Sequence, residues 1–230
     1  QDGSGAVAHR PTGVFLQAAS GCNLDCIMCV EHLRPPESKH GRDARFIDPR
    51  VMERITGELL TTSTTLHIGL GGEPTLAPDL IHVLREAHSL GQSVELTTNG
   101  TLLHRPGLAR AVAECVRELR ISIDAATAPT YEKIRQGSSW SRLRANLDLL
   151  ARERAELGPE SRLQLTLVFV AMRSNIDELS EFVRLARDVG AQAVRVQHLI
   201  PTTSEGAEEA LALESGRYGR ALVAARELAS

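Results

Sequence analysis

Short apolar runs alternate with amphipathic stretches along most of this 230-residue chain. The runs are rich in Val, Ile and Leu, which is typical of buried strands. They occupy residues 14–19, 66–70, 94–97, 119–123, 163–169 and 194–198. Helical periodicity is clear between them, at 48–60, 79–90, 108–117 and 179–190. Strands alternating with helices predict an α/β fold with a parallel sheet and right-handed crossovers.

One face of several predicted strands is polar. In the fourth run the apolar residues take alternate positions, so Arg120, Ser122 and Asp124 share the opposite face. Glu95 and Arg195 hold equivalent positions in their own strands. A sheet covered by helices on both faces would be apolar throughout. The pattern therefore favours a partial (β/α)6 barrel of parallel strands, open on one side, with a polar lumen.

The charged residues on that polar face admit two interpretations. Glu95, Arg120 and Arg195 either form buried structural ion pairs or face a polar substrate as candidate catalytic residues. The alternation of residues is compatible with both.

The chain divides into three parts. Residues 1–12 are rich in Gly, Ala and Ser and are expected to form a flexible segment. Residues 13–201 hold all the strand–helix units and form one domain. Residues 202–230 read as a helical segment that stops without a further strand or a Pro/Gly terminator. We therefore expect it to lead to a C-terminal extension that this sequence does not contain.

Composition excludes several classes of protein. Hydrophobic residues make up 42% of the chain and charged residues 24%, which is typical of a folded domain rather than a disordered one. The net charge is −3, aromatic residues are only 3%, and no basic stripe predicts nucleic-acid binding. No apolar stretch reaches the length of a membrane span or marks a secretory signal. We expect a cytoplasmic protein without nucleic-acid or membrane partners.

Three of the four cysteines lie within eight residues, directly after the first predicted strand. In a reducing compartment, Cys22, Cys26 and Cys29 indicate a metal site rather than disulfides. An iron–sulfur cube normally takes four cysteines, so three would leave one iron open to an outside ligand. His32 offers an alternative, because it could complete the site of a non-catalytic Cys3His zinc-binding module. Cys115 falls in a helical pattern and is expected to be a core thiol.

The sequence Cys22-Asn-Leu-Asp-Cys26-Ile-Met-Cys29 resembles the C-x3-C-x2-C signature of radical S-adenosylmethionine (radical SAM) enzymes. Further matches follow in the family's order, from about Val14 to Pro201. They are Gly71-Gly72-Glu73-Pro74-Thr75-Leu76, Thr97-Thr98-Asn99-Gly100-Thr101, Ser122-Ile123-Asp124 with Thr130 to Arg135, and Val194 to Pro201. The GGEP motif at the next strand end makes the zinc module much less favoured.

The resemblance implies two cofactors. Cys22, Cys26 and Cys29 would hold a [4Fe–4S] cluster, and SAM would bind the fourth iron through its amino and carboxylate groups. In the family, an electron from a reducing partner such as flavodoxin or ferredoxin cleaves SAM. The resulting 5′-deoxyadenosyl radical abstracts hydrogen from the substrate.

The resemblance also implies which residues bind SAM. Gly71, Gly72, Glu73 and Pro74 would meet the methionine amino group, since glycines let the backbone approach closely. Asn99 could cap its own turn or reach SAM, and we favour the cap.

On later strands, Ser122 and Asp124 suit the ribose hydroxyls, or the SAM carboxylate in the case of Ser122. Arg135 matches an arginine that binds the SAM carboxylate through two hydrogen bonds in some relatives. The alternative interpretation is an arginine on the surface of a helix. Leu199 matches a position that packs on adenine, although ordinary core packing explains it nearly as well. Met28 stands where an aromatic residue is common, and its thioether could fill the same space.

The stretch from Ser122 to Arg135 resembles relatives that carry a SPASM or twitch extension with auxiliary clusters. Those enzymes modify ribosomal peptides, sulfatases or small natural products. Such an extension needs more cysteines, and none follows Cys115. We therefore expect the catalytic core of a longer enzyme that oxidises or epimerises a peptide or natural-product substrate. The alternative within the family is a cofactor-maturation enzyme.

Overall fold

The computed structural model describes residues 11–69, 71–211 and 214–229. Its main feature is a six-stranded sheet with the order β1-β3-β4-β5-β7-β8, in which every neighbouring pair is parallel. The strands are β1 (Gly13–Leu16), β3 (Thr65–Ile68), β4 (Ser93–Thr98), β5 (Glu118–Ser122), β7 (Gln164–Ala171) and β8 (Ala193–His198). Each overlaps one of the predicted runs, so the parallel α/β prediction is confirmed.

Helices connect the strands, and the predicted ones are found. The α-helices are α1 (Pro49–Ile55), α2 (Leu80–Ser89), α3 (Leu108–Cys115), α4 (Ala128–Ile134), α5 (Trp140–Leu157), α6 (Leu179–Asp188), α7 (Ser204–Glu209) and α8 (Ser215–Ala229). Shorter helical turns are η1 (Val30–Leu33), η2 (Pro36–Gly41), η3 (Thr56–Leu60), η4 (Pro74–Leu76), η5 (Gly158–Glu160) and η6 (Ile176–Glu178). Asp48 caps α1, because its carboxylate accepts a hydrogen bond from the Arg50 amide at 2.8 Å.

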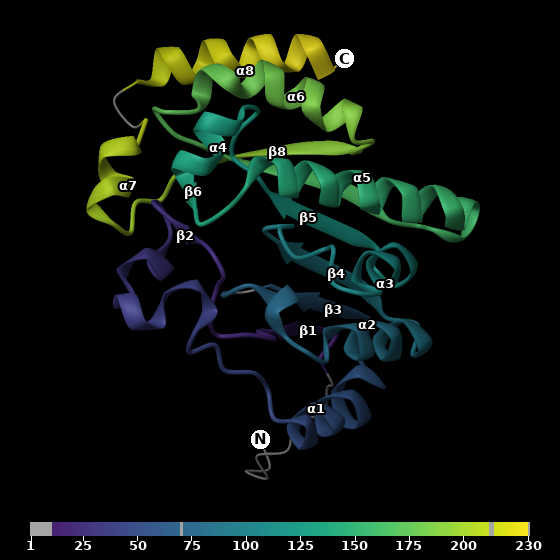
Figure 1. The fold of residues 1–230 in the computed structure, drawn as a ribbon. Helices are drawn as coiled ribbons and strands as arrows, with labels where there is room; N and C mark the ends of the chain where they lie inside the picture. The colour runs from purple at the N-terminus through teal and green to yellow at the C-terminus, as the bar shows by residue number, and fades with distance from the viewer. Residues whose placement is uncertain (1–10, 70, 212–213, 230) are drawn as a thin grey trace, which may run out of the picture.

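The helices bury one face of the sheet and leave the other open. Alternate strand residues such as Leu96, Ile121 and Leu167 are fully buried in the main core. Their neighbours Glu95 and Arg120 point to the opposite face and stay partly exposed. In Figure 1, α2, α3, α5 and α6 lie together along one side of the sheet. Since β1 and β8 are edge strands that do not pair with each other, the barrel is partial and open, as predicted.

A second sheet lies beyond the carboxyl ends of the main strands and was not predicted. It pairs β2 (Asp25–Cys26) with β6 (Arg135–Gln136) in antiparallel register. Figure 1 shows these two short strands on the side of the molecule where α7 also lies. The pairing fixes the cysteine segment to the turn that follows α4.

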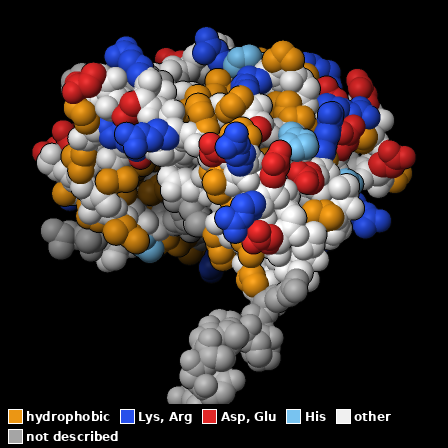
Figure 2. Space-filling model, turned by 90° about the horizontal axis from the view of Figure 1, so that it is seen from below, with side chains coloured by type: hydrophobic (Ala, Val, Ile, Leu, Met, Phe, Trp, Pro, Cys, Tyr) orange, Lys and Arg blue, Asp and Glu red, His pale blue; other side chains and the backbone are white. Residues whose placement is uncertain are grey.

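Cys115 is buried in the main core on α3, which confirms the core-thiol prediction. Within the described ranges no helix is long and apolar enough to cross a membrane. The face seen in Figure 2 mixes acidic, basic and apolar side chains without a large area of one charge.

Candidate functional site

The three clustered cysteines follow β1 and receive N–H donors from several directions. Cys26 is buried, whereas Cys22 and Cys29 are half-buried. The Leu24 amide lies 3.4 Å from the Cys22 sulfur, and Arg135 Nη1 lies 3.7 Å from the Cys26 sulfur. Donors of this kind stabilise the negative charge of cysteine sulfurs in iron–sulfur clusters.

Burial raises the pKa of Cys22 to about 12 and that of Cys26 to about 11. Both are therefore thiols at neutral pH without metal, and a metal that binds them must displace their protons. In the described part of the chain, no three Cys, His, Asp or Glu side chains form a preformed metal cage. The fit to a cluster therefore rests on the three sulfurs, their spacing and the N–H donors around them.

The zinc alternative required His32 as a fourth ligand. Its Nδ1 atom instead lies 2.8 Å from the Asp25 carboxylate. This contact engages one ring nitrogen with a carboxylate, and the histidine forms no metal site with the cysteines among the described residues.

Glu73 is 2% exposed, and its carboxylate is fully engaged by protein donors. Oε1 accepts from the Thr75 amide at 3.0 Å and from the Thr75 and Thr98 hydroxyls, each at 2.5 Å. Oε2 accepts from the Asn99 amide at 2.8 Å. The side chain thus ties the GGEP loop to the end of β4, which leaves the loop backbone to meet a ligand. The sequence analysis placed Thr75 and Thr98 in family motifs but gave them no role, although hydroxyl residues at strand ends are a usable signal.

The GGEP loop presses against the segment that follows β1. Gly72 has φ +60°, and a Cβ atom there would lie 2.4 Å from the Ala19 carbonyl oxygen. The Glu73 amide donates to the Gly21 carbonyl at 2.7 Å. Pro74 is buried at the start of η4. Only glycine fits this close approach, so the motif brings its loop to the cysteine segment. A Cβ atom at the preceding Gly71 would lie 3.1 Å from the side-chain nitrogen of Gln17.

Asn99 caps its own turn, as favoured from the sequence, and also contacts the cysteine segment. Its Oδ1 accepts from the Thr101 amide at 2.9 Å, which confirms that it caps its own turn. Its Nδ2 donates to Asn23 Oδ1 at 2.9 Å and lies 3.8 Å from the Cys22 sulfur. The β4 turn is therefore connected to the cysteine segment.

Ser122 and Asp124 do not share an open face, contrary to the strand pattern. β5 ends at Ser122, which is partly exposed and makes no side-chain hydrogen bond within the described residues. Asp124 adopts φ +65° and is fully buried. Its Oδ1 accepts from the Val170 amide at 2.8 Å, and its Oδ2 lies 2.5 Å from Arg135 Nη2. The left-handed turn at Asp124 ends the alternation.

Arg135 lies in β6 and is 6% exposed, so the surface interpretation is wrong. Besides Asp124 and the Cys26 sulfur, its guanidinium contacts the Ile123 carbonyl through Nε at 3.1 Å. Burial lowers the pKa of Arg135, but the negative charge of Asp124, its hydrogen bond and the other neighbouring groups together outweigh this, and the net direction is upward. The arginine therefore stays charged.

Leu199 and Met28 meet in a small apolar cluster beside the cysteine segment. Both pack, partly exposed, against the buried side chains of Ile27, Ile134 and Met172. The family resemblance implies that Leu199 packs on adenine, and the structure places Met28 in the same cluster.

The inner face of the sheet carries a chain of ion pairs. Arg120 lies 2.8 Å from Glu95 and 2.7 Å from Glu118, and His67 Nδ1 lies 3.1 Å from Glu95. Burial opposes the effect, but Arg120 and His67 together lower the pKa of Glu95. The ion-pair interpretation thus holds for Glu95 and Arg120. Arg195 is exposed on β8 and makes no ion pair or hydrogen bond with the described residues.

A cavity of about 890 Å³ lies elsewhere, around the amino-terminal ends of β4 and β5, and is lined by residues that include Gln92, Cys115 and Arg117. The candidate site is at the opposite, carboxyl ends of the strands, where the cysteine segment, the GGEP loop and the β4 turn meet. Active sites of parallel α/β folds lie at this end.

The parallel sheet, with the cysteine segment and the GGEP loop at the carboxyl ends of its strands, is typical of one class of enzyme. The family model of the Radical SAM superfamily matches residues 16–186, so the chain belongs to that superfamily. Its cofactors are accordingly a [4Fe–4S] cluster and SAM. This overturns the zinc-module alternative.

The individual relatives share less than a third of their aligned residues with this chain. The chain is 28% identical over 207 residues to the AdoMet-dependent heme synthase of Methanosarcina barkeri, covering 86% of this chain and 53% of the synthase. It is 27% identical over 189 residues to the PqqA peptide cyclase of Ruegeria pomeroyi, covering 81% of this chain and 46% of the cyclase. The structure of Streptococcus suis SuiB bound to precursor peptide SuiA aligns with TM-score 0.67 at 16% identity, covering 95% of this chain and 47% of SuiB. The chain thus spans about half the length of these relatives.

Proposed function

We propose that this chain is the catalytic core of a radical SAM enzyme that modifies a peptide, by oxidation or epimerisation. The observation that carries the proposal is the contact between the cysteine segment and the GGEP loop, made by the Glu73 amide and the Gly21 carbonyl. It joins the two motifs that the chemistry needs side by side. When bound, the cluster and SAM supply an adenosyl radical that abstracts hydrogen from the substrate.

The residues divide into ligands and supports. Cys22, Cys26 and Cys29 hold the cluster, and the backbone of the GGEP loop accepts hydrogen bonds from the SAM ammonium. The partly exposed Ser122 hydroxyl, which has no protein partner among the described residues, binds the carboxylate or a ribose hydroxyl. The side chains of the remaining candidates already contact protein groups; these candidates are Asn99, Asp124 and Arg135. Their main role is therefore to hold the shape of the site, and any contact with SAM is secondary.

Adenine would pack on the apolar cluster that contains Met28 and Leu199. Replacement of Leu199 with Ala should weaken SAM binding about tenfold, the equivalent of about 1.4 kcal/mol. Ile200→Ala is the matched control, because Ile200 is 80% exposed and belongs to neither apolar cluster. Equal affinities of the two variants, measured by calorimetry on cluster-loaded protein, would remove Leu199 from the site.

A peptide substrate is supported by the names of two relatives, a peptide cyclase and an enzyme bound to a precursor peptide. The open inner face offers polar contacts, and Arg195 is free there to bind an anionic group. The similarity to a heme synthase supports the alternative, a cofactor-maturation enzyme. Flavodoxin or ferredoxin would be the electron donor in either case.

The basic chemistry is tested with anaerobically reconstituted protein reduced by dithionite. We expect a [4Fe–4S]⁺ EPR signal that changes when SAM is added, and formation of 5′-deoxyadenosine. Cys26→Ser should lose both, whereas Cys115→Ser should keep them because Cys115 is a core residue on α3. A cluster indifferent to SAM would contradict the assignment of the GGEP loop.

The SPASM-like part of the proposal concerns the longer protein to which residues 13–201 would contribute the catalytic domain and residues 202–230 a link to an extension. We expect the full-length protein to hold clearly more iron than one [4Fe–4S] cluster supplies, because auxiliary clusters bind iron of their own. Iron analysis that finds only one cluster would favour the single-cluster alternative.

A further inference from the structure

A buried ion pair between Asp124 and Arg135 lies next to Cys26, one of the three clustered cysteines. Asp124 is fully buried and Arg135 is 6% exposed, and their side chains meet at 2.5 Å. Such a pair is costly unless hydrogen bonds satisfy its other atoms. Here they do, since Asp124 also accepts from the Val170 amide and Arg135 also donates to the Ile123 carbonyl. The remaining guanidinium nitrogen, Nη1, lies 3.7 Å from the Cys26 sulfur.

The backbone fixes this arrangement from both sides. Cys26 and Arg135 are direct partners in the β2–β6 sheet, and the neighbouring Ile27 amide donates to the Ile134 carbonyl at 3.1 Å. On the other side, Asn175 Nδ2 donates to the Asp124 carbonyl at 2.8 Å. The backbones of Cys26 and Arg135 therefore cannot separate without breaking the β2–β6 sheet, and the contacts to Asp124 and the Ile123 carbonyl hold the guanidinium.

A cluster gains negative charge when it accepts an electron. A fixed cation next to a ligand sulfur favours the reduced form, and a fixed anion slightly further away opposes it. In this low-exposure environment, solvent screens neither charge strongly.

We propose that Arg135 and Asp124 are a charge pair that sets the reduction potential of the cluster bound at Cys26. Arg135 raises the potential, and Asp124 holds Arg135 in place and partly offsets its charge. The inference rests on the proposed function. It gives Arg135 a role toward the cluster in place of a grip on the SAM carboxylate. The electron itself comes from an external low-potential reductant, and no covalent bond changes in this step.

The test is a redox titration of the reconstituted protein, followed by EPR, in which dithionite supplies the electrons. Arg135→Gln leaves an uncompensated anion, so the potential should fall. Asp124→Asn leaves an uncompensated cation, so the potential should rise, and asparagine tolerates the left-handed backbone that this position needs. We expect each single variant to change the ratio of reduced to oxidised cluster at least tenfold, which is 59 mV for a one-electron couple.

The double variant R135Q/D124N restores neutrality and should return the potential toward that of the wild type. Shifts of the same sign in both single variants, or no shift in either, would overturn the proposal. If a single variant loses its iron, the double variant decides. Retention of iron and potential supports a charge effect, whereas loss of iron shows that the pair only maintains the shape of the site.

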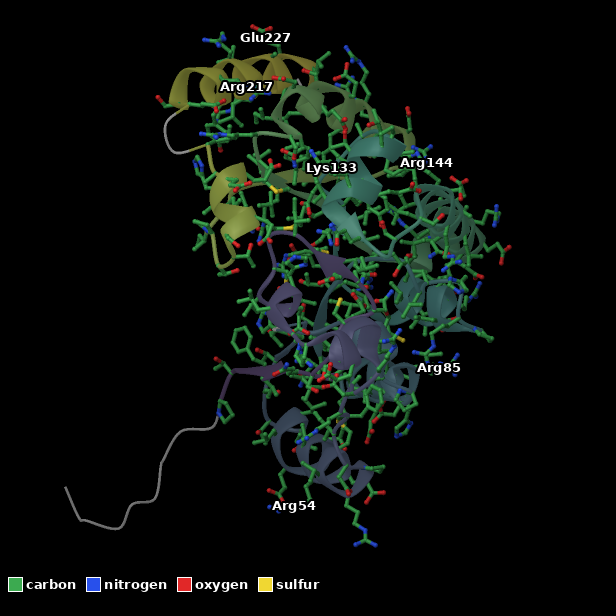
Figure 3. All side chains as sticks on the ribbon, turned by 60° about the vertical axis from the view of Figure 1, so that its left-hand side comes forward. Arg54, Arg85, Lys133, Arg144, Arg217 and Glu227 are labelled. Carbon is green, nitrogen blue, oxygen red and sulfur yellow. The ribbon has the colours of Figure 1, made fainter. Side chains whose placement is uncertain are left out.

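The matched control is the exposed pair Arg54 and Glu58 on α1 and η3, whose side chains meet at 3.1 Å. Figure 3 shows Arg54 at the outer edge of the molecule. The variants R54Q and E58Q change the net charge equally, and the potential should stay constant. The proposed function and this inference fail in different ways. Absence of 5′-deoxyadenosine in the wild type refutes the former, whereas unchanged potentials in active variants refute the latter.

Discussion

Single buried polar residues organise this site. Glu73, Asn99 and Asp124 are each enclosed, and each has its polar atoms paired with groups from another segment. A buried carboxylate without partners would be strongly unfavourable, so these contacts are requirements of the fold as well as of the site. The loops around the cysteines are therefore held by side chains whose first role is within the protein.

Glu73→Gln should destabilise the metal-free chain by about 2 kcal/mol. The amide retains one acceptor oxygen but places an NH₂ group against a hydroxyl or amide donor, such as the Asn99 N–H. Urea denaturation measures the effect. Glu58→Gln is the control, because the Glu58 side chain is 61% exposed and should change stability little. Equal stabilities of the two variants would show that the Glu73 contacts contribute nothing.

The sequence identified residues whose identity alone carries chemistry, and was weaker where geometry decides. Cys22, Cys26 and Cys29 are proposed as cluster ligands from their spacing, and Cys115 was correctly placed in the core. Arg135 could not be placed, because nothing local shows that the chain leaves α4 as a strand and turns this residue inward. Asp124 was misplaced because a single left-handed residue is invisible to a period-of-two pattern.

At the scale of elements, the close approach of two loops defines the site. The GGEP loop after β3 and the cysteine segment after β1 touch through Gly72 and Glu73. Since β1 and β3 are adjacent parallel strands, their carboxyl ends bring both loops to one edge. A side chain inserted where the two loops touch should therefore weaken both folding and SAM binding.

Gly72→Ala should cost roughly 3 kcal/mol of stability and weaken SAM binding, because the new Cβ atom would lie 2.4 Å from a carbonyl oxygen. Gly91→Ala is a matched control. Gly91 also has positive φ, +73°, but no atom lies within 4 Å of a Cβ atom built there. It should cost only about 1 kcal/mol and leave SAM affinity unchanged. Denaturation and calorimetry on both variants separate the contact from backbone strain.

The ion pairs across β3, β4 and β5 should make stability depend on pH. The pKa of Glu95 is lowered in the folded chain, so its contribution is present above the ordinary carboxyl pKa and is lost as the pH falls through the lowered one. The stability difference between wild type and Glu95→Gln should therefore shrink between neutral pH and about pH 3. A difference that is constant across this range would show that the Glu95 charge is not stabilised by Arg120 and His67.

Elements with strong periodicity were predictable, and those without it were not. All six strands of the main sheet overlap predicted apolar runs. The β2–β6 sheet was missed because each strand has two residues, Asp-Cys and Arg-Gln, with neither an apolar run nor an alternation. Its pairing depends on contacts between segments far apart in the sequence.

For the whole molecule, the decisive feature is that helices cover only one face of the sheet. The core lies between the helices and the outward side chains of the strands, so the carboxyl-end loops are attached to a rigid base. SAM binding should change the dynamics of these loops and leave those of the sheet and its helices unchanged.

Hydrogen exchange measured by mass spectrometry tests this expectation. Adding SAM to the cluster-loaded chain should slow exchange in segments 19–29, 71–76 and 97–101. Exchange in α8, which packs on α6 away from these loops, should not change. Slowing confined to the amino-terminal ends of β4 and β5 would place the ligand in the other cavity and contradict the assigned site.

The one-sided covering has an evolutionary consequence. Outward residues such as Val94 and Leu96 are fully buried, so most substitutions there carry a penalty in folding. An inward residue such as Arg195 is exposed and packs against no buried core, and it can vary with little effect on stability. Selection can therefore act on the inner surface almost independently of the scaffold. A sheet built in this way can acquire new substrates by drift at a few lumen positions while its cofactor loops stay constant.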